Sequence, residues 1–203
     1  MKMTIDCRLG FLCKSTGSVY ARKQLPPADP IYGQADNRCA GYVVSVQGPA
    51  ALESPRNEIY DRATLKFHIS PLSGPPSVLE GELAFKLKSI YSQVIRVEDL
   101  PRTGIYLGVQ PIGEHDFALL VNTVTLALLD AAIPLHFIPV CASLGDADLV
   151  VNVQTGKGIF HQAKGICTPF NSAELPKEAI EGNFKWIVER ISEKRHYSPD
   201  LKR

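Results

Sequence analysis

Residues 117–134 read FALLVNTVTLALLDAAIP, and this stretch decides the fold that the sequence predicts. From Phe117 to Ala132 the segment is apolar on nearly every side of a helix. Its polar exceptions are Asn122, Thr123, Thr125 and Asp130. A helix that is apolar all round is buried rather than exposed on one face. We therefore predict a central helix over 117–132, with other layers of structure packed around it.

Short segments on both sides of this helix predict strands, because they are rich in β-branched residues or alternate between apolar and polar residues. Before the helix, the predicted strands are Val19–Lys23, Cys39–Gln47, Ala63–Ser70 and Ile105–Val109, and the second is expected to end at Gly48-Pro49. After the helix they are Ile138–Leu144, Leu149–Val153 and Gly158–Cys167. The first two of these are expected to form a hairpin around Gly145-Asp146-Ala147.

Two further helices are predicted from single apolar stripes at helical spacing, over Glu80–Val97 and from Pro176 to Arg195. The order of elements is then β-β-β-α-β-α-β-β-β-α. Single helices between groups of strands predict a layered α/β (α+β) fold in one domain, residues 1–203. Residues 24–38, QLPPADPIYGQADNR, predict a Pro-rich surface loop, because proline removes the donors of a strand ladder.

Composition and charge indicate the class of protein and exclude several kinds of binding site. The chain is 45% hydrophobic and 21% charged, with a formal net charge of +1, so any nucleic-acid surface must be a local patch. The five cysteines are scattered and predict neither a disulfide framework nor a zinc site. The amino terminus lacks the apolar core of a signal peptide, and the apolar region 117–144 is broken by Pro134, His136 and Pro139. We expect an intracellular protein without a membrane span.

The motifs of common cofactor sites are missing from the sequence. There is no Walker-type or dinucleotide-binding glycine pattern, and Gly156-Lys157-Gly158 is interpreted as part of a hairpin turn. The histidines show no metal-ligand spacing. His115-Asp116 could be a general-base pair, but a helix cap, with Asp116 accepting from the first-turn amides, is favoured. We expect no metal and no cofactor.

Four stretches nevertheless resemble one known family. They are GFLCKSTGSVYARK (10–23), VVSVQGPAA (43–51), EIYDRATLKFHISPLSGPP (58–76) and LVNTVTLALLDAAIPLHFIPVCASLGDADLVVN (120–152). Together they resemble the RNase PH-like subunits of the eukaryotic exosome, and are most similar to the exosome component five type. The resemblance rests on Gly17-Ser18, Gly48-Pro49, the strand at Ala63–Phe67 and the helix signature Ala127–Pro134. It covers roughly residues 8–196 and implies an RNase PH-like domain.

The same resemblance locates a catalytic site and implies that this chain has lost it. Active members carry a Gly-Thr-Arg segment before the central helix, whose arginine binds phosphate, and Phe117 stands at that position. They also carry two aspartates six positions apart, for which this chain has Asn152 and Gly158. Phenylalanine offers no guanidinium to a phosphate. Asparagine neither carries a charge nor transfers a proton near neutral pH, and glycine has no side chain.

The resemblance further implies a non-catalytic subunit of a six-membered ring of RNase PH-like proteins. Caps with S-one and KH domains would sit on the ring, RNA would thread its pore, and the chain would reside in the nucleus, nucleolus and cytoplasm. Two alternatives stay open: an active phosphorolytic 3′–5′ exoribonuclease, and a stand-alone RNA-binding homodimer. An isolated ring subunit is itself expected to form dimers through surface that the ring covers.

Three basic residues are the candidate RNA contacts. Lys86 and Lys88 fall off the apolar stripe of the first predicted helix, and Arg102 lies just beyond that helix. Cations on one exposed face can neutralise phosphates without reading the bases. The alternative interpretation, left open by the sequence, is that these residues are an ordinary solvated helix face.

Overall fold

The computed structural model describes residues 5–25, 38–52, 58–144, 147–163 and 177–196. Five strands form one sheet in the order β1-β2-β3-β5-β4: β1 (Ile5–Leu9), β2 (Gly17–Gln24), β3 (Cys39–Ala51), β4 (Thr64–Ile69) and β5 (Thr103–Gly113). All neighbours in this sheet are antiparallel except β4 and β5, which are parallel. The second sheet is a meander of β6 (Pro139–Leu144), β7 (Ala147–Asn152) and β8 (Gly158–Ala163).

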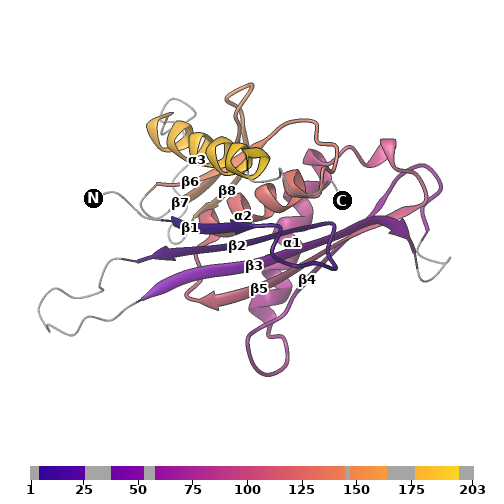
Figure 1. The fold of residues 1–203 in the computed structure, drawn as a ribbon, viewed down its shortest axis with the longest axis horizontal. Coiled ribbons are helices and arrows are strands. Elements are labelled where there is room, and N and C mark those ends of the chain that lie inside the picture. The colour runs from indigo at the N-terminus through magenta and orange to yellow at the C-terminus, as the bar shows by residue number, and fades with distance from the viewer. Residues whose placement is uncertain (1–4, 26–37, 53–57, 145–146, 164–176, 197–203) are drawn as a thin grey trace, which may run out of the picture.

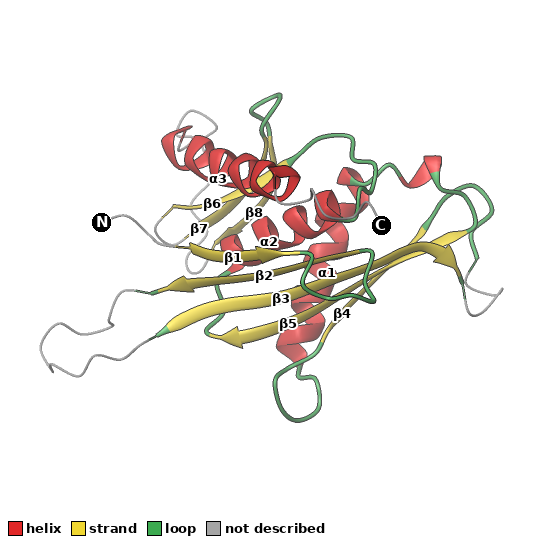
Figure 2. Cartoon of the chain, in the orientation of Figure 1, coloured by secondary structure: helices red, strands yellow, loops and turns green. Residues whose placement is uncertain are grey.

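The helices are α1 (Val78–Val94), α2 (Phe117–Asp130) and α3 (Lys177–His196), with a short 3-10 turn, η2 (Val97–Asp99), after α1. α2 packs against β2 and β3 on one side and against β6 and β7 on the other, so it lies between the two sheets (Figure 1). α1 packs against β4, and α3 packs against β6, α2 and β1 (Figure 2). The predicted α/β class and layered arrangement are confirmed.

Two details of the predicted order are wrong. The sequence prediction omitted β1, which pairs with β2 from Ile5↔Lys23 to Leu9↔Val19. It also ended the second predicted strand at Gly48-Pro49, whereas β3 runs through this pair to Ala51. The pairing of β3 with β5 shifts register between Gln47 and Ala50. Gly48 and Pro49 lie in this bulge, and the paired residues resume at Ala50 opposite Gly104.

Two further boundaries differ: β5 is longer at both ends than the predicted strand Ile105–Val109, and the first predicted helix is shifted along the chain. The first predicted helix begins earlier than Glu80 because Ser77 and Glu80 form a capping box, and it ends before Val97. The hydrogen bond from the Ser77 hydroxyl lowers the pKa of Glu80, with smaller contributions from backbone amides and nearby His115. The Pro-rich loop lies outside the described residues over 26–37, as do 164–176. Among the described residues, none of the helices combines the length and apolar character needed to cross a bilayer.

The polar residues of α2 are satisfied inside the core, which explains how a helix between two sheets tolerates them. The Asn122 side chain donates to the Cys141 carbonyl (3.0 Å) and accepts from the Cys141 amide (2.9 Å), as a neighbouring strand would. The single hydroxyl proton of Thr125 is shared between the carbonyls of Val121 (3.1 Å) and Pro139 (3.2 Å). Because a buried polar group without a partner is costly, these bonds fix the position of α2 against β6.

The C-terminal end of α2 is held by a buried carboxylate. The Asp130 side chain is only 2% exposed; it accepts the amide of Ser18 (3.0 Å) and the ammonium of Lys194. Next to it, Gly17 lies so close to α2 that a Cβ atom there would stand 2.5 Å from the amide nitrogen of Ala131. The Gly-Ser turn and the Ala-Leu-x-Asp helix signature, recognised separately in the sequence, are therefore in direct contact.

This contact predicts that Gly17→Ala destabilises the fold. The added methyl would overlap backbone atoms of α2, which cannot move aside as a flexible side chain would. We expect the free energy of unfolding to fall by about 1–3 kcal/mol in urea titrations. The matched control is Gly182→Ala, an exposed position of α3 with open space around it, where alanine should add about 0.5–1 kcal/mol. Equal effects at both glycines would contradict the packing argument.

Candidate functional site

Phe117, which the family resemblance aligns with the arginine of active members, is a core residue. It is the first residue of α2 and is 5% exposed. Its ring lies 6.0 Å from the ring of Phe160 on β8, at an interplanar angle of 41°. This pair fills the space between the start of α2 and the second sheet. An apolar contact of this kind gives an anion nothing to bind.

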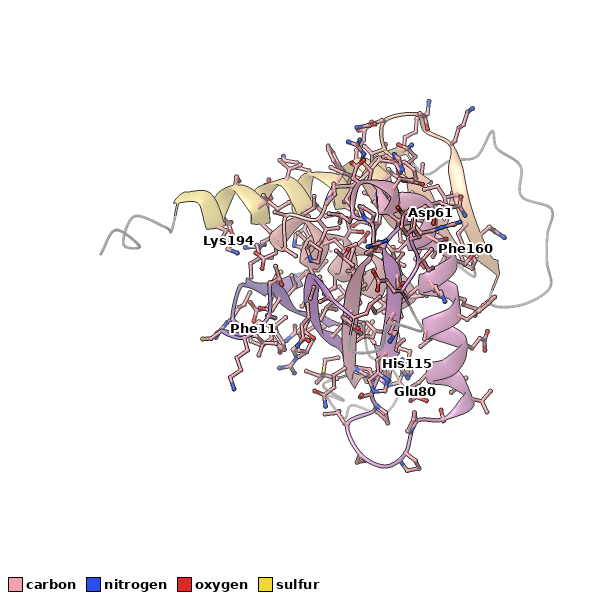
Figure 3. The ribbon with its side chains drawn as sticks, turned by 90° about the vertical axis from the view of Figure 1, so that its right-hand side faces the viewer. Phe11, Asp61, Glu80, His115, Phe160 and Lys194 are labelled. Atoms are coloured by element: carbon pink, nitrogen blue, oxygen red, sulfur yellow. The ribbon has the colours of Figure 1, made fainter. Side chains whose placement is uncertain are left out.

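Asp116, directly before Phe117, is the N-cap of α2. Its Oδ1 accepts the amide of Leu119 (3.1 Å), and its Oδ2 pairs with Lys23 Nζ at 2.6 Å. The Asp116 amide donates to the hydroxyl of Tyr42 (3.0 Å), whose pKa is raised by burial. The predicted capping role is confirmed. His115 is exposed and lies close to Glu80 at the start of α1 (Figure 3).

Asn152 and Gly158 stand at the two sides of one turn between β7 and β8. The Asn152 Oδ1 accepts the amides of Gln154 (2.9 Å) and Thr155 (3.4 Å), so its side chain closes the turn. Gly158 begins β8 and pairs with Val151. The interpretation of Gly156-Lys157-Gly158 as part of a hairpin turn is confirmed, with Gly156 at a φ of +67°.

The structure therefore brings Phe117, Asn152 and Gly158 close to the start of β8. Asn152 and Gly158 share a turn, and Phe117 contacts Phe160, two residues after Gly158. The groups present at these positions are the apolar ring of Phe117, the neutral side-chain amide of Asn152 and, at Gly158, the backbone alone. Within the described residues, no group of three or more His, Cys, Asp or Glu side chains could hold a metal ion.

The candidate RNA contacts are not gathered in one place. Lys86 forms an ion pair with Glu82 one turn earlier (2.5 Å), and Lys88 is exposed. Arg102 instead lies over the ring of Tyr60, 4.4 Å from its centroid, and 3.7 Å from Glu58. Figure 3 shows Asp61, the neighbour of Tyr60, far along α1 from Glu80.

Sequence reasoning missed a hollow of about 540 Å³ that runs over β4. Its lining includes Lys66 and His68 of β4, Phe85 and Lys88 of α1, and Tyr106 of β5. Lys66 Nζ lies 5.2 Å from the centroid of the Tyr106 ring. The alternation in TLKFHI places Lys66 and His68 on one face of a strand, and this was the available signal. Nothing in the sequence showed that Lys88 would lie beside that strand.

The chain was compared with protein families, with individual proteins and with solved structures. No protein-family model matches the chain. The chain is 30% identical over 138 residues to the exosome complex component rrp46 of Schizosaccharomyces pombe, in an alignment covering 66% of this chain and 54% of that protein. The chain thus spans about half the length of this curated relative.

Two solved structures share the fold over nearly the whole chain. The crystal structure of rice (Oryza sativa) Rrp46 superposes with a TM-score of 0.72 at 19% identity, covering 93% of this chain and 94% of that one. An archaeal exosome core chain gives a TM-score of 0.60 at 13% identity, covering 93% and 87%.

The fold is that of the RNase PH-like exosome proteins, and the resemblance inferred from the four sequence stretches is confirmed. Within that class, the sequence match relates the chain to Rrp46. The resemblance to the component five type is compatible with this match.

The environments of Phe117 and Asn152 predict opposite responses to restoring the residues of active members. Asn152→Asp should change the free energy of unfolding by less than about 0.5 kcal/mol, because a carboxylate accepts the same two turn amides. Phe117→Arg should destabilise by about 3 kcal/mol or more, because it buries a charge and removes the Phe160 contact. Urea titration of both variants tests this. A stable Phe117→Arg protein would show that the site retains room for a phosphate-binding arginine.

Proposed function

We propose that the chain is a non-catalytic subunit of an exosome ring, shaping a channel for 3′–5′ RNA processing and degradation. The observation that carries the proposal is the relation to Rrp46 together with the structural use of the former catalytic positions. Phe117 is packed in the core, Asn152 closes a turn, and Gly158 has no side chain. The fold has been kept while the groups that would bind phosphate and transfer protons are absent from these positions.

The proposed partners are other RNase PH-like subunits, with S-one and KH-type cap proteins and RNA. The proposed location is the nucleus, including the nucleolus, and the cytoplasm. Support comes from the relatives, one described as an exosome complex component and one as an archaeal exosome core. A ring of related subunits also gives a reason to keep the fold without its chemistry, because neighbours need the surface of a subunit rather than its active site.

Catalytic silence is the test of this proposal against the alternative of an active exoribonuclease. Purified chain, given single-stranded RNA, inorganic phosphate and magnesium, should release no nucleoside diphosphate above a control without protein. The physical reason is that no arginine or carboxylate stands at the three positions where active members bind phosphate and transfer protons. Phosphorolysis that persists through further purification and is lost in an Asn152→Ala variant would overturn the proposal.

Lys86, Lys88 and Arg102 remain the proposed RNA contacts. Lys88 is the strongest of the three, because it is exposed and shares its hollow with Lys66 and His68. The ion pair of Lys86 with Glu82 is on a helix surface, where such pairs contribute little and a phosphate can compete for the cation. Arg102, resting on Tyr60, would contact RNA at a separate point.

Replacing Lys86 and Lys88 by glutamate should weaken RNA binding by the assembled complex. We expect a similar loss for unrelated RNA sequences and a salt dependence whose slope falls by about one for each phosphate contact removed. Fluorescence anisotropy at several salt concentrations, on complexes shown to be intact, measures both. Lys177→Glu combined with Lys185→Glu, two exposed changes on α3, is the control with the same change in net charge. If the Lys86 and Lys88 variant binds as the control does, these lysines are a solvated helix face.

A further inference from the structure

The solvent-facing side of the five-stranded sheet carries two adjacent rows of residues across β3, β5 and β4, which lie side by side (Figure 1). One row is formed by Gln47, Tyr106 and Lys66, and the next by Ser45, Gly108 and His68. Paired residues of neighbouring strands point to the same face of a sheet. Val46 and Leu107, which lie between the two rows, are buried in the core. The two rows therefore point away from the core.

These two rows form the floor of the hollow of about 540 Å³ described above, and α1 contributes Ala84, Phe85 and Lys88 to its lining. Gly108 stands between Ser45 and His68 and has no side chain. A Cβ atom at this glycine would lie 2.8 Å from the Ser45 hydroxyl oxygen, so a larger residue would crowd the floor. Glycine inside a strand often marks a place where a ligand approaches the backbone closely.

The charge of the hollow is positive. Lys66 and Lys88 line it with His68, and none of its described lining residues is acidic. Lys86 is paired with Glu82, whereas no described carboxylate forms an ion pair with Lys66 or Lys88. Because the formal net charge of the whole chain is only +1, two ammonium groups at one hollow are a local concentration of positive charge. The ligand that complements them is an anion.

An aromatic ring lies beside these cations. Tyr106 is half-buried, and Lys66 Nζ lies over its ring, so one ring face is turned toward the hollow. Phe85, which is 73% exposed, adds a second ring to the lining. A base of any identity can stack on such a ring, and stacking is stronger than an exposed cation–π contact. A base can therefore replace the ammonium over Tyr106, and Lys66 can then turn to a phosphate.

We propose that this hollow binds one nucleotide unit of single-stranded RNA. The base stacks on Tyr106, and Lys66 and Lys88 neutralise the flanking phosphates. The volume of the hollow lies within the ~300–1,000 Å³ of small-ligand sites. A base inside a duplex cannot reach the ring, so the site selects unpaired RNA. The inference rests on the proposed function for its ligand, RNA, and the site is complete within one chain.

Fluorescence anisotropy of the full chain with labelled RNA about 12 nucleotides long, single-stranded or duplex, tests the stacking contact. Tyr106→Leu should raise the dissociation constant for the single strand about five- to fiftyfold, whereas Tyr106→Phe, which keeps the ring, should change it less than about twofold. The matched control is Tyr20→Leu, a half-buried tyrosine on the same sheet face but outside the hollow. The duplex should bind about tenfold more weakly than the single strand.

The phosphate contact is tested by Lys66→Gln, a change at an exposed position. This variant should bind RNA more weakly, and the slope of its salt dependence should fall by about one. Lys185→Gln on α3 removes the same charge from an exposed position and should leave both quantities unchanged. Circular dichroism checks that each variant is folded.

The proposal is overturned if Tyr106→Leu binds RNA as Tyr20→Leu does, or if the duplex binds as tightly as the single strand. Weakening by Lys66→Gln alone would identify a surface for anions in general and would also overturn it. A chain that copurifies with exosome proteins but shows no dependence on Tyr106 refutes this site alone. Tyr106-dependent binding by a chain without exosome partners supports the site and refutes the proposed subunit role.

Discussion

The fold depends on how the end of α2 is held against the start of β2. Asp130 carries a buried charge, and it is satisfied by one backbone amide from β2 and one ammonium group from α3. Gly17 allows the backbones of β2 and α2 to meet at a distance that any side chain would prevent. Since α2 packs against both sheets, the contact of its C-terminal end with the start of β2 sets the position of both sheets relative to the helix. The Asp130 carboxylate is buried while Lys194 is half exposed, so loss of its protein partners would leave a buried carboxylate poorly satisfied.

Some parts of this fold could be predicted from the sequence, and others depend on contacts that the sequence does not show. The central helix was predicted because its apolar residues surround it, and Asp116 was predicted as its cap because a carboxylate there meets free amides. β1 was missed because Ile5–Leu9 is short and alternates with charged residues near the chain start. The continuation of β3 past Gly48-Pro49 was missed because a bulge, which depends on the partner strand, absorbs the break. The contact between Gly17 and α2 could not be deduced either, since two motifs far apart in sequence show no distance in space.

The candidate site also has features that the sequence predicted and features that only the structure shows. That Phe117, Asn152 and Gly158 lack catalytic groups follows from their residue types. The structure adds that Phe117 packs on Phe160 of β8 and that Asn152 and Gly158 flank the turn between β7 and β8. What each does instead is visible only in three dimensions: a ring contact with Phe160 and an amide that closes a turn. The basic residues were grouped by their positions along the chain. Arg102 follows α1 by only a few residues, yet Tyr60 and Glu58 hold it apart from Lys88.

The central claim is that this chain serves as a subunit rather than as an enzyme or a solitary RNA-binding protein. The measurement that tests it most directly is affinity purification of the tagged chain from cells of its own organism, with identification of the copurifying proteins and the mass of the native complex. The account predicts several RNase PH-like exosome proteins in amounts equal to the chain, in a complex many times its 22.3 kDa mass. Recovery of the chain alone, or only as a homodimer, with no exosome protein in stoichiometric amount, would contradict it.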